Sequence, residues 1–382
     1  MRLALALITF AACVKVPYQR ADAVSAEPVE TLGQDRIALK WKFATADRLG
    51  ELTPQEFASP AIVGDTAYIG SASGTLFALR AATGYVRWKR KVGAVFSAPL
   101  VFANTLYVGT GEGVLVALDA QTGKEKWRYQ GRGGIAQTPA TTGELIIFAN
   151  ESDQVVALEA ATGKFKWQFK SESVPDEFAL RGHAGVAVDT ELVFTGFSNG
   201  TLVALRKDTG SVAWSTSLKG DAERFVDVDG TPIVLGQTLY VTSASGGIHA
   251  VDKQTGLVKW RVPFWDAALP SSTGNVGGIT TDGKTLYASV ADLGTYALDL
   301  DGNVLWRVGA RGGGEPATPV IFEDLLVYAL ASDGVFIADR RTGETLEYFD
   351  PGHGVSAQPT VTPDGRMFVM SNRGVLYAFD ID

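Results

Sequence analysis

The chain has 382 residues, of which 46% are hydrophobic and 20% charged, so it can bury a large core; length alone would suggest two or three domains. The formal net charge is −8, and the densest basic run, at 89–91, fits the solvated edge of an outer strand, so nucleic acid is not expected as a partner. The single cysteine, Cys13, excludes an intramolecular disulfide.

The N-terminus has the pattern of an export signal. Arg2 precedes an apolar stretch at 3–12, which ends in small residues and is too short to span a bilayer. The segment Phe10-Ala11-Ala12-Cys13 resembles a bacterial lipobox, which implies that Cys13 becomes the lipidated first residue of the mature protein. The alternative is an ordinary secretory signal that contains a cysteine. We predict a signal peptide at 1–12, a lipidated N-terminus with a flexible tether at 13–35, and a folded domain at 36–382.

Short apolar strands that contain an alanine in a fixed position recur along the folded domain. The spacings between successive alanines are 39, 40, 47, 46, 47, 41 and 40 residues. Such a period indicates one repeated unit rather than separate domains. The aligned alanines are Ala78, Ala117, Ala157, Ala204, Ala250, Ala297, Ala338 and Ala378.

Each unit has further parts that fit a four-stranded antiparallel sheet. A hairpin partner precedes the alanine strand, and a short strand, often introduced by proline, precedes that hairpin. After the alanine strand comes a turn, usually Thr-Gly, in which glycine can take a positive φ, and four residues later a tryptophan. The seventh unit has Glu347 at the tryptophan position, and the sequence does not explain this departure.

The eighth unit stops four residues after Ala378 and lacks its outer strand. A matching strand with no unit of its own lies at 38–43 and contains Trp41. Pairing this strand with the last unit would close a ring and remove exposed sheet edges. The sequence therefore predicts an all-β, eight-bladed β-propeller of four-stranded antiparallel blades, closed by the N-terminal strand.

The segment 117–127 is similar to the tryptophan-docking repeat of quinoprotein propellers, and the lipobox, tether and eight blades together resemble the BamB family of outer-membrane assembly lipoproteins. Two segments strengthen the resemblance: 178–182, which contains Leu-Arg-Gly, and 224–232, which contains Asp-Val-Asp-Gly-Thr-Pro. The resemblance implies a scaffold held at the periplasmic face of the outer membrane by its lipid. It also implies that the partner is the periplasmic part of the barrel-insertion protein, with unfolded barrel clients as a further expectation.

The partner-binding residues that we predict lie in or beside these segments. The three long spacings are consecutive, and their extra residues fall at 171–183, 219–228 and 264–275, between one blade's outer strand and the next blade's inner strand. These connections emerge on one face, where propellers commonly bind partners. The predicted partner-binding residues are Phe178, Leu180, Arg181, Arg224, Asp227, Asp229 and Trp265.

Each of these residues also has a structural interpretation. Leu180 could begin a buried strand, and Arg181 could pair with Asp227 or Asp229 inside the protein. Trp265 fits a binding anchor or a cap on the local core equally well. For Asp227 and Asp229 we expect a supporting role through side-chain hydrogen bonds to the backbone.

An enzyme is the main alternative, because quinone-dependent dehydrogenases share the repeat. The three histidines, His183, His249 and His353, lie in separate blades, and His249 stands in an aligned strand where a packed role is expected. No nucleophile, base and orienting group occur at a recognisable spacing, and the glycine runs at 132–134 and 311–314 do not form strand-to-helix phosphate loops. We expect no enzyme activity, no cofactor and no metal. A propeller that serves another periplasmic or surface assembly remains the third possibility.

Overall fold

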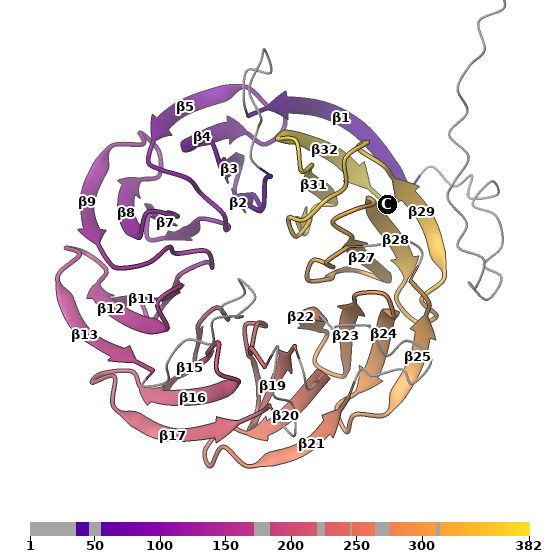
Figure 1. The fold of residues 1–382 in the computed structure, drawn as a ribbon. Coiled ribbons are helices and arrows are strands. Elements are labelled where there is room, and N and C mark those ends of the chain that lie inside the picture. The colour runs from indigo at the N-terminus through magenta and orange to yellow at the C-terminus, as the bar shows by residue number, and fades with distance from the viewer. Residues whose placement is uncertain are drawn as a thin grey trace, which may run out of the picture. The chain divides into compact units, whose positions relative to one another are not determined.

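The computed structural model describes residues 36–45, 55–171, 184–219, 226–244, 247–263, 276–310 and 314–382. Within them, eight four-stranded antiparallel sheets follow one another around a ring, as Figure 1 shows. The predicted eight-bladed propeller is therefore confirmed. The signal peptide and tether predicted at 1–12 and 13–35 lie outside the described residues and stay predictions.

Each blade runs from an inner strand beside the ring axis to an outer strand at the rim. Blade 1 contains β2 (Ala61–Val63), β3 (Thr66–Gly70), β4 (Thr75–Arg80) and β5 (Val86–Lys91). Blade 2 contains β6 (Leu100–Phe102), β7 (Thr105–Gly109), β8 (Val114–Asp119) and β9 (Glu125–Gln130). Blade 3 contains β10 (Ala140–Thr141), β11 (Leu145–Asn150), β12 (Gln154–Glu159) and β13 (Phe165–Lys170). Blade 4 contains β14 (Ala187–Val188), β15 (Leu192–Gly196), β16 (Thr201–Arg206) and β17 (Val212–Ser217).

The second half of the ring repeats this order. Blade 5 contains β18 (Ile233–Leu235), β19 (Thr238–Ser243), β20 (Gly247–Asp252) and β21 (Val258–Val262). Blade 6 contains β22 (Val276–Thr281), β23 (Thr285–Val290), β24 (Gly294–Asp299) and β25 (Val304–Val308). Blade 7 contains β26 (Val320–Phe322), β27 (Leu325–Ala329), β28 (Val335–Asp339) and β29 (Thr345–Phe349). Blade 8 contains β30 (Thr360–Val361), β31 (Arg366–Met370), β32 (Val375–Ile381) and β1 (Ile37–Ala44).

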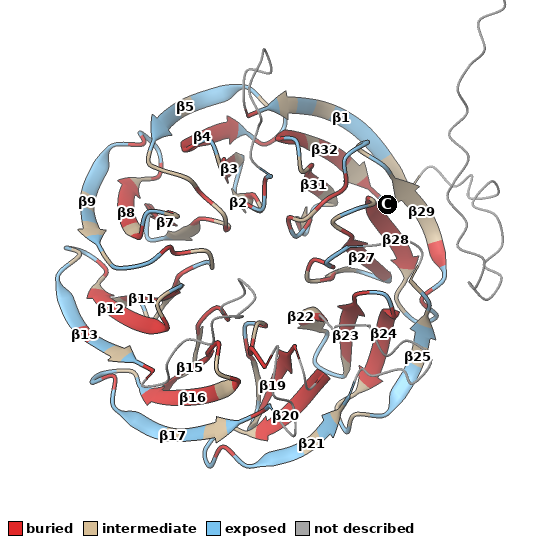
Figure 2. Ribbon diagram, viewed as in Figure 1, coloured by how far each residue is buried: buried red, intermediate tan, exposed pale blue. Residues whose placement is uncertain are grey.

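The core lies between blades, at the two middle strands of each sheet. These strands are buried on both faces, whereas the outer strands other than β29, which is largely half-buried, expose most of their residues to solvent (Figure 2). All eight aligned alanines are buried, and in seven blades the alanine lies opposite the tryptophan of the outer strand, as Ala78 lies opposite Trp88. A small side chain in this column lets neighbouring sheets approach closely, which is why the sequence period is so regular.

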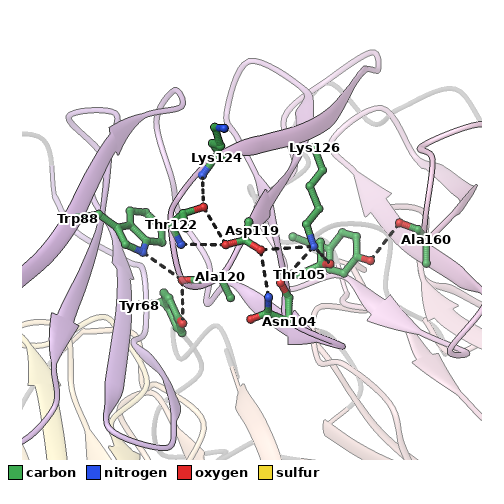
Figure 3. Close-up of polar contacts among 11 residues, drawn as sticks. Tyr68, Trp88, Asn104, Thr105, Asp119, Ala120, Thr122, Lys124, Lys126 and Ala160 are labelled. Atoms are coloured by element: carbon green, nitrogen blue, oxygen red, sulfur yellow. Dashed lines mark hydrogen bonds and ion pairs between the residues drawn. The ribbon is translucent and has the colours of Figure 1, made fainter.

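In every blade except blade 7, a tryptophan of the outer strand joins the blade to the next one. In Figure 3 the indole Nε1 of Trp88 donates a hydrogen bond of 3.1 Å to the carbonyl of Ala120 in blade 2, which also accepts 3.1 Å from the hydroxyl of Tyr68. The same indole packs on Gly123, where a Cβ atom would come within 2.7 Å of the ring. Gly123 has a φ of +66°, so the turn needs glycine both for its backbone and for this contact. Seven tryptophans donate to the next blade in this way, namely Trp41, Trp88, Trp127, Trp167, Trp214, Trp260 and Trp306.

The ring closes where β1 pairs antiparallel with β32, from Ile37 opposite Ile381 to Ala44 opposite Val375. This closure also explains Glu347. In blade 8 the outer strand is β1, which does not follow β32 in the chain, so no Thr-Gly turn joins the two strands and could receive a tryptophan from blade 7. Instead the Glu347 carboxylate accepts hydrogen bonds from the backbone N–H of Arg36 (2.6 Å) and of Ile37 (3.1 Å), and so holds the start of the closing strand.

We expect the substitution Glu347→Ala to lower the free energy of unfolding by about 1.5–3 kcal/mol, because it removes a charged acceptor from two backbone donors. Glu347→Gln, which keeps one acceptor oxygen, should lose less. Glu347→Trp, which restores the residue of the other units, should also destabilise the protein, because no turn receives the ring. Urea unfolding measures all three effects. An unchanged unfolding midpoint in Glu347→Ala would show that the carboxylate does not stabilise the ring closure between β1 and β32.

Candidate partner-binding face

One end of the propeller gathers two kinds of loop. The linkers from each outer strand to the next inner strand emerge at the same end as the turns between the second and third strands, because successive strands alternate in direction. Hydrogen bonds join the two: Leu218 N donates 2.8 Å to Gly200 O, and Ser171 N donates 3.0 Å to Asp153 O. We call this end the loop face. The Thr-Gly turns lie at the opposite end.

The three enlarged linkers of the sequence join β13 to β14, β17 to β18 and β21 to β22, so they stand on consecutive blades at the loop face. Most of their length lies outside the described residues. This includes Phe178, Leu180, Arg181, Arg224 and Trp265, whose partner-binding roles stay predictions. What the structure does describe is how the ends of these linkers are fixed.

The first enlarged linker begins and ends at fixed points between blades 3 and 4. Asp153, which is 4% exposed, accepts 2.6 Å from Ser198 Oγ and 3.3 Å from Ser198 N, and so ties a turn of blade 3 to one of blade 4. Asn199 donates 3.4 Å to Ser171, where the linker starts. At its far end, the hydroxyl of Thr195 donates to the carbonyl of Ala184, at 3.3 Å.

The second enlarged linker returns to the core through Val228, which is fully buried. Val228 N donates 3.3 Å to Phe197 O, and the carbonyl of Asp227 accepts 2.8 Å from Ala244 N in blade 5. Asp227 is 1% exposed and Asp229 is half-buried. The supporting role expected of Asp227 and Asp229 stays a prediction.

The described ends of the first and second enlarged linkers meet in the fold. Gly185, which follows the Leu-Arg-Gly segment closely, donates its backbone N–H to the hydroxyl of Thr231 in the Asp-Val-Asp-Gly-Thr-Pro segment, at 3.1 Å. A Cβ atom at Gly185 would lie 2.2 Å from that hydroxyl oxygen, so only glycine fits. Movement of either linker would therefore strain the other.

Sequence reasoning missed the role of Asp153. Its φ is +53°, and it stands in the column that holds Gly74, Gly113 and Gly200 in other blades. A side chain in a glycine column with a positive φ is uncommon outside Asn and Asp. That departure was the signal for a carboxylate that bridges two blades.

The histidines do not form a metal site in the described part of the chain, where no cluster of three or more histidine, cysteine or acidic side chains occurs. His249 is 2% exposed, as its strand position predicted, and its Nε2 lies 3.1 Å from Ser243 Oγ. Burial, together with the positive charge of Arg261, lowers the pKa of His249 to about 4. His183 lies outside the described residues.

No described helix is long and apolar enough to span a membrane.

Comparisons with known proteins agree on one family. The family model described as outer membrane protein assembly factor BamB matches residues 29–98, 91–287 and 235–348. The BamB of Burkholderia pseudomallei is 28% identical over 338 residues, which cover 84% of this chain and 83% of that protein. The BamB of Shewanella oneidensis is 25% identical over 204 residues, covering 52% of this chain and about half (49%) of that protein.

Solved structures share the fold. The structure of BamB from Moraxella catarrhalis has a TM-score of 0.75 at 22% identity and covers 90% of this chain and all (100%) of that one. The quinohemoprotein alcohol dehydrogenase of Comamonas testosteroni has a TM-score of 0.69 at 17% identity, covering 90% of this chain and 76% of that enzyme. At these identities the structural matches establish the propeller and do not distinguish a scaffold from a dehydrogenase.

Proposed function

Because the chain belongs to the family of outer membrane protein assembly factor BamB, we propose that it is a non-enzymatic scaffold of the machinery that assembles β-barrel proteins in the outer membrane. In this proposal the lipid on Cys13 holds the protein at the periplasmic face of the outer membrane. The loop face docks onto the periplasmic domains of the barrel-insertion protein, with Leu180 and Arg181 as the principal contacts.

The observation that carries the docking proposal is the fixed frame beneath the enlarged linkers. Three consecutive blades carry them on one face, and the ends of the first two are tied to buried groups, Asp153 and Val228 among them. A linker whose two ends are fixed loses less conformational entropy on binding than one whose ends are free. Arginine is also enriched among the few residues that contribute most of the binding energy at protein interfaces.

Unfolded barrel clients are the second partner that we expect. The outer strand of each described sheet has a neighbour on one side only, and β17 carries no charged side chain. Uncharged edge strands accept added strands more readily than edges protected by lysine. The edge of blade 4 is therefore our candidate for a transient client contact.

The docking proposal is tested by affinity capture from native membranes. We expect the wild-type chain to recover the barrel-insertion protein. The double variant Leu180→Ala, Arg181→Glu should recover at least about tenfold less of it, because it lacks an interface anchor. The matched control is Leu257→Ala, Arg341→Glu, which changes the same residue types at exposed turns of the opposite end.

Each outcome is informative. Loss in the loop variant with full recovery by the control supports both the partner and the face. Equal recovery by all three proteins would keep the partner and refute the site. The proposed function is refuted if the wild-type chain recovers no barrel-insertion protein under conditions in which other subunits of that machinery co-purify with the barrel-insertion protein.

A further inference from the structure

The outer strands of four consecutive blades concentrate positive charge. Strands β1, β5, β9 and β13, which follow one another around the ring in Figure 1, carry ten basic residues, all exposed, and one acidic residue, Glu125. The other four outer strands, β17, β21, β25 and β29, carry three basic residues and Glu347. The basic rim consists of Lys40, Lys42, Arg87, Lys89, Arg90, Lys91, Lys126, Arg128, Lys166 and Lys170.

Protection of sheet edges does not account for this distribution. Lysine on an edge strand prevents unwanted strand pairing, and all eight outer strands are edges that need it. Yet β17 has no charged residue, while β5 has four basic residues among its six. The asymmetry is the more pronounced because the whole chain has a net charge of −8.

Internal ion pairs neutralise only half of the basic rim. Five of its residues pair with acidic side chains, as Lys40 does with Asp380 at 2.7 Å and Arg87 with Asp65 at 2.9 Å. The other five have no ion pair within the described part of the chain, and three of them lie on β5. The unpaired group is Lys42, Lys89, Arg90, Lys91 and Lys170.

We propose that the basic rim binds the surface of an anionic phospholipid bilayer, with β5 nearest to the headgroups. Alternate residues of a strand point to the same side, so Arg87, Lys89 and Lys91 form one row, flanked by the charges of β1 and β9 on the neighbouring blades. The curved rim does not need to touch the membrane everywhere. Charges act over a Debye length of about 8 Å at physiological ionic strength, and lysine stems extend the reach further.

The path of the chain favours a bilayer over an acidic protein as the occupant. The described chain enters the propeller at Arg36, directly before β1, which is itself one of the four strands of the basic rim. A lipid on Cys13, as the proposed function has it, would therefore be connected to the propeller through a strand of this rim. The proposal goes beyond docking through the loop face and is independent of it, since the two surfaces share no residue.

The test uses the full chain with Cys13→Ser, so that no lipid can contribute, and flotation with vesicles of phosphatidylcholine alone or mixed with phosphatidylglycerol. We expect binding only to the mixed vesicles, and release at high salt. The triple variant Lys42→Glu, Lys89→Glu, Lys91→Glu should bind about a hundredfold more weakly, at about fivefold for each basic residue near an anionic surface.

The matched control is Lys259→Glu, Lys284→Glu, Arg341→Glu, which changes the net charge equally on blades 5, 6 and 7 and should bind within about twofold of the parent chain. The corresponding glutamine variants of both triplets, with circular dichroism, separate a loss of charge from a loss of fold. Equal weakening by both triplets, or binding to neither kind of vesicle, would overturn the proposal. Binding of the Cys13→Ser chain to an acidic peptide but not to anionic vesicles would also overturn it. Because these vesicles contain no protein partner, failure here leaves the docking proposal intact.

Discussion

Trp167→Ala should lower the free energy of unfolding by about 3–5 kcal/mol, the cost typical of removing a buried aromatic side chain. Trp167 is 5% exposed, and its indole Nε1 donates 2.7 Å to the carbonyl of Lys207 in the next blade. Its ring also packs on Gly210, where a Cβ atom would come within 2.5 Å. The variant leaves a cavity between blades 3 and 4 and removes the donor to a carbonyl that the ring shields.

Urea unfolding followed by far-ultraviolet circular dichroism measures this loss without relying on tryptophan fluorescence. Trp167→Phe is the matched control, because it keeps most of the packing and removes the N–H donor, at an expected cost of about 1 kcal/mol. A loss below about 1 kcal/mol in the alanine variant would mean that inter-blade docking contributes little to stability.

The second large effect is a pH dependence that originates at His249. Its pKa is lowered from 6.5 to about 4 in the folded protein by burial and by Arg261. His249 takes up a proton more readily in the unfolded chain than in the folded one. Its contribution to the free energy of unfolding is therefore fully present above pH 6.5 and is lost as the pH falls toward 4. The difference between the two pKa values corresponds to about 3 kcal/mol.

This contribution is isolated by comparing the wild-type protein with His249→Gln, which can still hydrogen-bond to Ser243 but does not titrate. We expect the wild-type protein to lose about 3 kcal/mol more than the variant between pH 6.5 and pH 4. Parallel profiles for the wild-type protein and His249→Gln would show that His249 is not kept neutral by the fold.

Periodic features of the fold were predictable from the sequence because each blade repeats them. The buried alanine column, the glycine of each docking turn and the tryptophan that packs on it recur in register, and the pairing of β1 with β32 followed from one strand being in excess and one missing. Repetition allows one residue's role to be inferred from its counterparts in other blades.

Features that depend on a unique tertiary contact were not predictable in this way. The partner of Glu347 lies 311 positions away at Arg36, and the partner of Asp153 lies 45 positions away at Ser198. The sequence analysis noted Glu347 as a departure from the repeat without showing what it contacts, and it did not single out Asp153. For the candidate site, the sequence placed the enlarged linkers on one face, and the structure adds that Gly185 and Thr231, at the described ends of the first two linkers, are hydrogen-bonded to each other.

The pairing of β1 with β32 also governs the order in which this protein can fold. The strand at residues 37–44 has no partner until residues 375–381 have been synthesised, so it is made before the other described strands and is paired only after the last of them. Contacts of such large sequence separation form slowly, and an unpaired edge is prone to aggregation in the meantime. A chain cut short before β32 would display both an open β1 and an uncovered blade 7. Proteases and chaperones could therefore distinguish an incomplete chain from a complete one by whether β1 is paired with β32.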